Sequence, residues 1–294
     1  MRHLVFGGTG QVGTALVRLL RERAQEVVAP TRAEVDVADA SAVARFVARV
    51  SPDVVLNAAS YNFVDRAEKE PDVARAVNAD AVDAMARAAR ALGARIVHYS
   101  TDYVFDGSGR EPWRENDRPA PLNAYGRSKL EGEEAVRASG ARHLLLRTSW
   151  VHSATRASFV RTVLELAATR DALDMVADQF CCPSSADFIA ATTLELLARP
   201  SLAHEVFHVV PGGAVSRHAY AQEIVRAGND AGAPLRLAPE AICAVRLADR
   251  PAEAPRPPNA VLSCRRLEET LGIRAPGWKQ GVHETVRALV RGSR

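Results

Sequence analysis

The stretch HLVFGGTGQVGTALVRLL, from His3 to Leu20, decides the fold of this 294-residue chain. It begins with a short apolar run, His3 to Phe6, that has the length and composition of a buried strand. It ends with apolar residues from Ala15 to Leu20 that recur at helical spacing. A glycine-rich turn joins the two. A strand, a glycine turn and a helix in this order are typical of the unit that binds the pyrophosphate of a dinucleotide.

The three glycines of this turn have separate predicted roles. Gly7 permits the tight turn, Gly10 lets the backbone approach a pyrophosphate, and Gly13 lets the helix pack on the strand. Free N–H groups at the helix N-terminus favour an anion there. The spacing is G-x-x-G-x-x-G rather than G-x-G-x-x-G, and the alternative is a glycine-rich turn without a ligand. We expect a dinucleotide to bind through these residues of the turn: Gly7, Thr9, Gly10, Gln11, Val12 and Gly13.

The residues after the second predicted strand, 26–29, indicate which dinucleotide is preferred. An acidic residue usually stands here in proteins that bind the ribose 2′-hydroxyl of NAD. This chain has Thr31 and Arg32 instead, and a hydroxyl with a guanidinium suits the 2′-phosphate of NADPH. The alternative is that Arg32 is a solvated surface charge. Asp36 and Val37, which follow soon after, are predicted to hold the adenine edge.

Strands and helices continue to alternate along the first half of the chain. A third strand, 53–56, ends in Asn57, Ala58 and Ala59, whose small side chains would let a cofactor pass close by. The alternation predicts an α/β protein with a Rossmann-type, doubly wound parallel sheet. We expect an NAD(P)-binding domain over residues 1–150, to which 175–212 return, and a smaller C-terminal substrate-binding lobe over 151–294. The other predicted helices are 41–50, 71–92, 158–169, 186–198, 265–271 and 279–290, and the other strands are 95–99, 143–150, 173–176 and 206–210.

A second stretch, His98 to Lys129, contains the candidate catalytic groups. Thr101 follows a predicted strand, while Tyr125 and Lys129 stand four residues apart at the start of a helical pattern and therefore share one face. A nearby ammonium favours phenolate, so we expect the pKa of Tyr125 to lie below its ordinary value of about 10. With Thr101 holding a carbonyl oxygen and Tyr125 donating a proton, these groups could reduce a ketone if a dinucleotide supplies hydride.

Composition excludes several other classes of protein. The net charge is only +3 and no lysine or arginine block occurs, which argues against nucleic-acid binding. No run of 18 apolar residues predicts a membrane span, and the apolar N-terminal run is too short for a signal peptide. The four cysteines, two of them adjacent, fit neither zinc-site spacing nor a disulfide framework. We therefore expect reduced thiols, a cytoplasmic location, no membrane contact and no metal.

Seven motifs, in order along the chain, resemble the extended short-chain dehydrogenase/reductases and, within them, the dTDP-4-dehydrorhamnose reductase family. The glycine motif and Y-x-x-x-K are common to the superfamily, whereas STDYVF, RTSW and the late R-P-x-N are more specific to this branch. The motifs are GGTGQVG (7–13), PDVVLNAASYNFVDRAE (52–68), VHYSTDYVFDG (97–107), PLNAYGRSKLEGE (121–133), LLRTSWV (145–151), ADQFCCPSSADFIA (177–190) and PRPPNAVLS (255–263).

The resemblance implies an NAD(P)-dependent oxidoreductase with the catalytic residues Thr101, Tyr125 and Lys129, and Tyr125 as the acid. It implies NADPH, or NADH in its place, as hydride donor and a dTDP-linked 4-keto-6-deoxy sugar as substrate. The product would be dTDP-L-rhamnose, formed from dTDP-4-dehydro-L-rhamnose by a monomer or homodimer. The residues that stand where the family contacts the substrate are Val64, Thr101, Asp102, Tyr103 and Trp150, with Arg256 at the diphosphate end.

Departures from the family pattern leave alternatives open. Asn62, Phe63 and His152 differ from the usual residues, which would fit a reductase for another dTDP-4-keto sugar of a deoxysugar pathway. Cys181-Cys182 replaces a Gly-Ala-type pair, and Ser184 replaces a threonine. Thr14-Ala15 stands where some members carry an acid for a metal-bridged dimer, so the metal is not carried over. A 4,6-dehydratase is disfavoured because it would need an Asp-Glu pair after the threonine. A non-catalytic regulatory subunit is the alternative outside enzymes.

Overall fold

A six-stranded sheet forms the centre of the computed structural model, which describes residues 1–250 and 252–292. Its order is β10-β5-β4-β3-β1-β2, and every neighbouring pair is parallel. The predicted α/β, doubly wound fold class is therefore confirmed. The strands are β1 (Arg2–Phe6), β2 (Glu26–Val28), β3 (Val54–Asn57), β4 (Arg95–Thr101), β5 (Arg142–Thr148) and β10 (Glu205–His208).

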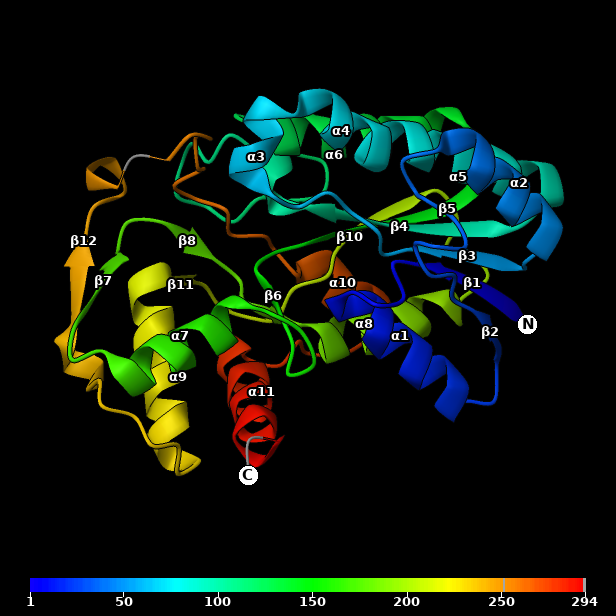
Figure 1. Ribbon diagram of the computed structural model, residues 1–294. Coiled ribbons are helices and arrows are strands. Elements are labelled where there is room, and N and C mark those ends of the chain that lie inside the picture. The colour runs from blue at the N-terminus through cyan, green and yellow to red at the C-terminus, as the bar shows by residue number, and fades with distance from the viewer. Residues whose placement is uncertain (251, 293–294) are drawn as a thin grey trace.

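Helices cover both faces of this sheet (Figure 1). Helices α1 (Gln11–Glu22), α8 (Ala186–Leu197) and α10 (Arg265–Leu271) lie on one face. Helices α2 (Ala40–Val50), α5 (Ala81–Leu92) and α6 (Ala124–Ala138) lie on the other. Apolar residues on the two faces of each strand supply two cores, because successive side chains of a strand point to opposite faces.

Strand β1 shows how the sequence builds these two cores. Leu4 and Phe6 pack with α2 residues such as Phe46, whereas Val5 packs with Leu16 of α1. The chain moves outward from β1 to β2 and then returns to β3 on the other side of β1. The loops after β1 and β3 therefore diverge at a switch point, which is where ligands bind in open α/β sheets.

The second half of the chain adds short strand pairs and a helical cluster beside the sheet (Figure 1). Helices α7 (Phe159–Thr169), α9 (Arg217–Asp230) and α11 (Trp278–Gly292) pack around the buried ring of Tyr220. The paired strands are β6 (Val151–His152) with β9 (Ser184–Ser185), β7 (Leu173–Val176) with β12 (Ile242–Val245), and β8 (Phe180–Cys181) with β11 (Val215–Ser216). Short 3-10 turns η3 (Pro239–Ala241) and η4 (Leu247–Asp249) flank β12.

Several element predictions need correction. Helix α9 and strand β12 were not predicted; Arg217 to Asp230 is rich in polar residues, and its apolar side is covered by α7, α11 and the β7–β12 strand pair. The helix predicted over 71–92 is interrupted: α4 (Pro71–Arg75) runs through a π-helical turn, η1 (Ala76–Asp80), into α5. The strand predicted over 143–150 ends at Thr148. In the described part of the chain, no helix is long and apolar enough to cross a bilayer.

Candidate active site

The glycine turn between β1 and α1 leaves no room for side chains. A Cβ on Gly7 would lie 2.6 Å from the backbone of Ala58, and one on Gly13 would lie 2.0 Å from the Gly7 carbonyl oxygen. Gly7 also has a φ of +73°, a conformation that favours glycine. Helix α1 starts after Gly10 without a side-chain cap, so its first N–H groups face the turn unpaired by a cap. The buried Oε1 of Gln11 has no hydrogen-bond partner among the described residues. These features fit a pyrophosphate.

The residues predicted to select NADPH lie on the surface after β2. The Arg32 side chain is 86% exposed, and its Nη2 makes a loose surface ion pair with Asp36 Oδ2 at 3.7 Å that a bound phosphate can replace. The Thr31 hydroxyl, in contrast, donates to Glu34 at 2.9 Å. The structure therefore offers Arg32 for a 2′-phosphate and leaves Thr31 already engaged.

The end of β3 is held by a buried hydrogen bond to β4. Asn57 Nδ2 lies 3.0 Å from His98 Nδ1, and Asn57 Oδ1 accepts from the Ala59 N–H at 3.2 Å. Both side chains are fully buried. The pair fixes the segment through Ala58, which packs directly against Gly7. Asn57, Ala58 and Ala59 thus lie beside the glycine turn, as a shared cofactor site requires.

Helix α6 packs closely on the segments of Tyr103 and Asn78 because it has a glycine at each contact. A Cβ on Gly126 would lie 2.2 Å from the Tyr103 carbonyl oxygen, and one on Gly132 would lie 2.1 Å from the Asn78 carbonyl oxygen. Asn78, in the π-helical turn, donates to Ser128 Oγ at 3.0 Å and accepts from the Tyr61 N–H at 2.9 Å. Asn78 therefore ties the loop after β3 to α6.

A buried ion pair anchors the same helix to the sheet. Arg147 of β5 meets Glu133 of α6 through two hydrogen bonds of 2.8 Å. Burial alone would raise the Glu133 pKa, but the hydrogen bonds and charge of Arg147 lower it to about 2. A fork-to-carboxylate pair restricts the angle as well as the distance between its partners. The position of α6, and of the side chains at its N-terminus, is thus defined at both ends.

Thr101, the last residue of β4, belongs to a chain of buried hydroxyls around Asp102. Its hydroxyl donates to Asp102 Oδ1 at 2.9 Å and accepts from the Tyr103 N–H at 3.2 Å. Ser149, which the sequence reasoning overlooked, donates to Asp102 Oδ2 at 2.7 Å. Burial raises the Asp102 pKa to about 6, although these hydrogen bonds oppose the rise.

Tyr125 lies at the first turn of α6, next to Thr101. The hydroxyls of Thr101 and Ser60 are its side-chain hydrogen-bonding partners, and its ring meets that of Tyr103 edge-on, with centroids 6.0 Å apart. Burial raises the pKa of Tyr125 to about 12, although both hydroxyls lower it. The prediction that its pKa lies below the ordinary value is therefore wrong for this structure, because burial outweighs every stabilising contact to the phenolate. Ser60 was not predicted as a site residue.

Lys129 is buried one helical turn after Tyr125. Its Nζ donates to the Tyr99 carbonyl oxygen at 2.6 Å. Burial lowers the Lys129 pKa to about 8, although Glu133 raises it. Thr101, Tyr125 and Lys129 thus lie close together at the C-terminal end of β4.

Trp150 belongs to a cluster of aromatic rings that includes residues of α7 and α9. Trp150 has a φ of +37°, which is rare for a bulky residue and marks a strained backbone. Its ring lies near those of Tyr220 and Phe159, with centroid distances of 6.0 and 6.1 Å. Arg217 of α9, which was not predicted as a site residue, places its guanidinium carbon 5.3 Å from the Trp150 ring centre.

The remaining predicted substrate residues lie near α3 (Val64–Lys69) and the late proline-rich segment. Val64 begins α3, and the next residue, Asp65, binds Arg256 Nη2 at 2.8 Å. His152 is buried, and its Nδ1 meets the Thr285 hydroxyl at 3.0 Å, so it joins β6 to α11. Phe63 is 57% exposed at the start of α3.

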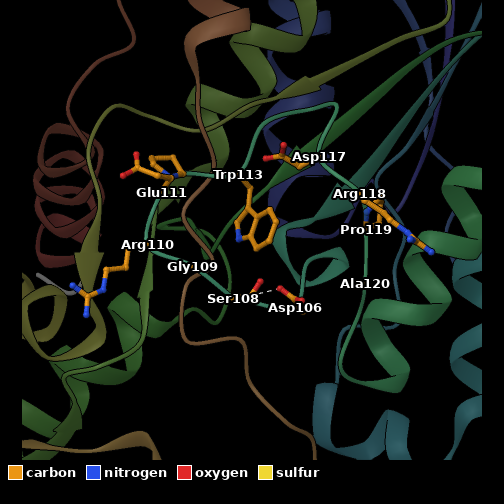
Figure 2. A pocket seen from close by; sticks show the side chains of 11 residues that line it. Asp106, Ser108, Gly109, Arg110, Glu111, Trp113, Asp117, Arg118, Pro119 and Ala120 are labelled. Carbon is orange, nitrogen blue, oxygen red and sulfur yellow. Dashed lines mark hydrogen bonds between the residues drawn. The ribbon is translucent and has the colours of Figure 1, made fainter.

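A separate cavity of about 760 Å³ opens along the loop between β4 and α6 (Figure 2). Charged side chains such as Arg118 and Asp117 surround the indole of Trp113 there. None of the predicted catalytic or cofactor residues lines this cavity. Over residues 1–250 and 252–292, no group of three or more His, Cys, Asp and Glu side chains is arranged to hold a metal ion.

Comparisons with known proteins indicate the same family over nearly the whole chain. The model of the family described as RmlD substrate binding domain matches residues 1–291. The dTDP-4-dehydrorhamnose reductase of Burkholderia thailandensis is 41% identical over 297 residues, which cover 99% of each chain.

Two solved structures are similar to this chain in three dimensions as well. A dTDP-4-dehydrorhamnose reductase from Clostridium acetobutylicum has a TM-score of 0.91 at 33% identity and covers 98% of this chain and 99% of its own. The Bacillus anthracis enzyme, solved in complex with NADP, has a TM-score of 0.89 at 28% identity and covers 97% and 98%.

Proposed function

Because this chain belongs to the RmlD substrate binding domain family, which includes dTDP-4-dehydrorhamnose reductases, we propose that it reduces the C4 ketone of dTDP-4-dehydro-L-rhamnose. The family resemblance that the motifs indicated is confirmed. The chain is an NAD(P)-dependent oxidoreductase, and its product is dTDP-L-rhamnose. NADPH is the hydride donor, with NADH as the alternative.

The residues around the β1–α1 turn fit the dinucleotide. Gly7, Gly10 and Gly13 leave the backbone bare, and the uncapped start of α1 offers N–H groups to a pyrophosphate. The exposed guanidinium of Arg32 is available for the 2′-phosphate that distinguishes NADPH. Bound there, the cofactor supplies hydride to the carbonyl carbon.

The proton for the reduced oxygen comes from Tyr125. Its pKa of about 12 keeps the phenol protonated at neutral pH, so the group holds a proton to give. An alkoxide is a far stronger base than a phenolate, so the proton moves to the substrate oxygen as negative charge develops. The Lys129 ammonium, one turn away, lowers the cost of the phenolate that remains.

The Thr101 hydroxyl holds the carbonyl oxygen beside Tyr125, and Asp102 is its hydrogen-bond acceptor before the substrate binds. A hydroxyl has one proton, and the Thr101 proton is directed to Asp102. To donate to the substrate, Thr101 turns this O–H away from Asp102, whose Ser149 hydrogen bond remains.

The observation that carries this proposal is the buried cluster of Thr101, Tyr125 and Lys129 next to the bare glycine turn. Substitution Tyr125→Phe removes only the acid, so ketone reduction should fall by about 10²- to 10⁴-fold. Binding of NADPH, measured by fluorescence titration, should be nearly unchanged. Turnover of dTDP-4-dehydro-L-rhamnose at the wild-type rate would contradict the assignment.

A second candidate substrate is another dTDP-4-keto sugar, as the replacements at Asn62 and Phe63 allow. Oxidation of NADPH should be measured against a panel of dTDP-4-keto-6-deoxyhexoses, with NMR on each product. A kcat/KM for another sugar above that for the rhamnose precursor would favour this alternative. We also propose a cytoplasmic location, where nucleotide sugars are made, and a monomer or homodimer as the working form.

A further inference from the structure

Arg217, the first residue of α9, packs its guanidinium against two neighbouring aromatic rings. The guanidinium carbon lies 5.3 Å from the ring centre of Trp150 and 4.8 Å from that of Phe159. The Arg217 backbone N–H donates to the Gln179 carbonyl oxygen at 3.2 Å, which fixes where the side chain starts. Stacking of this kind orients a guanidinium while leaving its N–H groups free to bind.

The charge of Arg217 is not neutralised by any described carboxylate. Its guanidinium makes no hydrogen bond or ion pair with the residues that the structure describes. Burial lowers its pKa, and the charged or polar groups that act on it are Tyr103, Cys181, Arg256 and Tyr220, none of them a carboxylate. A partly desolvated cation without a counter-ion is costly, and a bound anion would repay that cost.

Arg256, the residue predicted for the diphosphate end, differs in this respect. Its Nη2 binds Asp65 Oδ2 at 2.8 Å, and its Nη1 donates to the Ala254 carbonyl oxygen at 3.2 Å. Arg256 is therefore already paired, whereas Arg217 is not. Burial raises the pKa of Tyr103, and the charges of Arg256 and Arg217 both oppose the rise, so both arginines act on this phenol.

Arg217 is also linked to the candidate catalytic centre. Gln179, which receives its backbone hydrogen bond, is buried and is a side-chain hydrogen-bonding partner of Tyr103. Tyr103 in turn meets the Tyr125 ring edge-on. Gln179 and Tyr103 thus connect the Arg217 position to Tyr125, which suits a group that holds the part of the substrate beyond the sugar.

We propose that Arg217 binds the diphosphate of the dTDP-linked substrate and positions the sugar over Tyr125. This inference rests on the proposed function, because it takes a dTDP-sugar as the substrate. The free guanidinium of Arg217 meets the phosphate oxygens, while Arg256 remains paired with Asp65. Two parallel N–H···O bonds from one guanidinium match a phosphate group well.

The test compares dTDP with thymidine as ligands of the full chain, by isothermal titration calorimetry. The variant Arg217→Met keeps the length and apolar contacts of the side chain but removes its charge. It should bind dTDP about 10- to 100-fold more weakly and bind thymidine as the wild type does. The control is Arg226→Met on the same helix, where an exposed arginine lies 3.8 Å from Glu223; it should change neither affinity.

Kinetics give a second readout. For Arg217→Met, the KM for the dTDP-sugar should rise by a similar factor, with the KM for NADPH unchanged. If Arg217→Met and the wild type bind dTDP equally well, the role proposed for Arg217 is overturned, while the proposed function is not affected. A wild-type chain that binds dTDP no better than thymidine would instead count against the proposed function.

A further variant protects the test against misfolding. If the melting curve shows that Arg217→Met does not fold, Arg217→Lys takes its place, because lysine keeps the charge but loses the planar fork. It should lose about three- to tenfold in dTDP affinity and none in thymidine affinity. No loss, or an equal loss for both ligands, would overturn the proposal.

Discussion

Gly126→Ala should displace Tyr125 without altering any side chain that is proposed to act in catalysis. The added Cβ would lie 2.2 Å from the Tyr103 carbonyl oxygen, whereas real Cβ contacts essentially never fall below 3.0 Å. Helix α6 and the segment of Tyr103 must therefore separate by about 0.8 Å. Neither is free to move, because Arg147 anchors the helix and Tyr103 is buried in the 3-10 turn η2 (Asp102–Val104).

Two opposing effects set the size of the response. Alanine is a better helix former than glycine by about 1 kcal/mol, but overpacking a buried contact costs about 1–3 kcal/mol. We expect the free energy of unfolding to fall by about 1 kcal/mol. A misplacement of about 1 Å at a catalytic group costs roughly 10²-fold in rate, so kcat should fall far more than stability does.

The assay is NADPH oxidation with dTDP-4-dehydro-L-rhamnose, at a temperature well below the melting point of each protein. The control is Gly277→Ala, where the added Cβ meets nothing within 4 Å. The control should keep both kcat and melting temperature. A Gly126→Ala enzyme with wild-type kcat would refute the reasoning that this close contact sets the position of Tyr125.

Three further outcomes are expected. Burial gives Lys129 a pKa of about 8, so its ammonium is present below that pH and kcat/KM should fall about tenfold per pH unit above it; a flat profile there would contradict its role. Arg32→Ala should raise the KM for NADPH by about tenfold and leave that for NADH nearly unchanged, and equal effects would dismiss its contact with the 2′-phosphate. Treatment with EDTA followed by gel filtration should leave activity intact; a requirement for added Mg²⁺ would show that a metal takes part.

Much of the candidate site could be predicted because its parts are local. Gly7 to Gly13 form one continuous turn, and Tyr125 and Lys129 stand one helical turn apart. The strand pattern around β1, β3 and β4 also predicts that their C-terminal ends share an edge of the sheet. Such periodicities are properties of neighbouring residues, so the sequence reveals them directly.

Other features depend on contacts between distant segments. Ser149 and Asp102 are 47 residues apart and meet only because β4 and β5 are adjacent. Arg217 looks like any helix-start arginine until the fold brings it to Trp150 and leaves it without a carboxylate. The helix that carries it escaped prediction because its apolar side is defined by α7 and α11 rather than by a strong local pattern.

The pKa of Tyr125 depends both on a local sequence pattern and on contacts that only the fold creates. The sequence by itself determined that a lysine follows the tyrosine at helical spacing, and this favours phenolate. Only the tertiary structure decided how deeply the phenol is buried, and burial raises its pKa to about 12. Desolvation is a sum over everything that surrounds a group, so no pair of residues in a sequence can supply it.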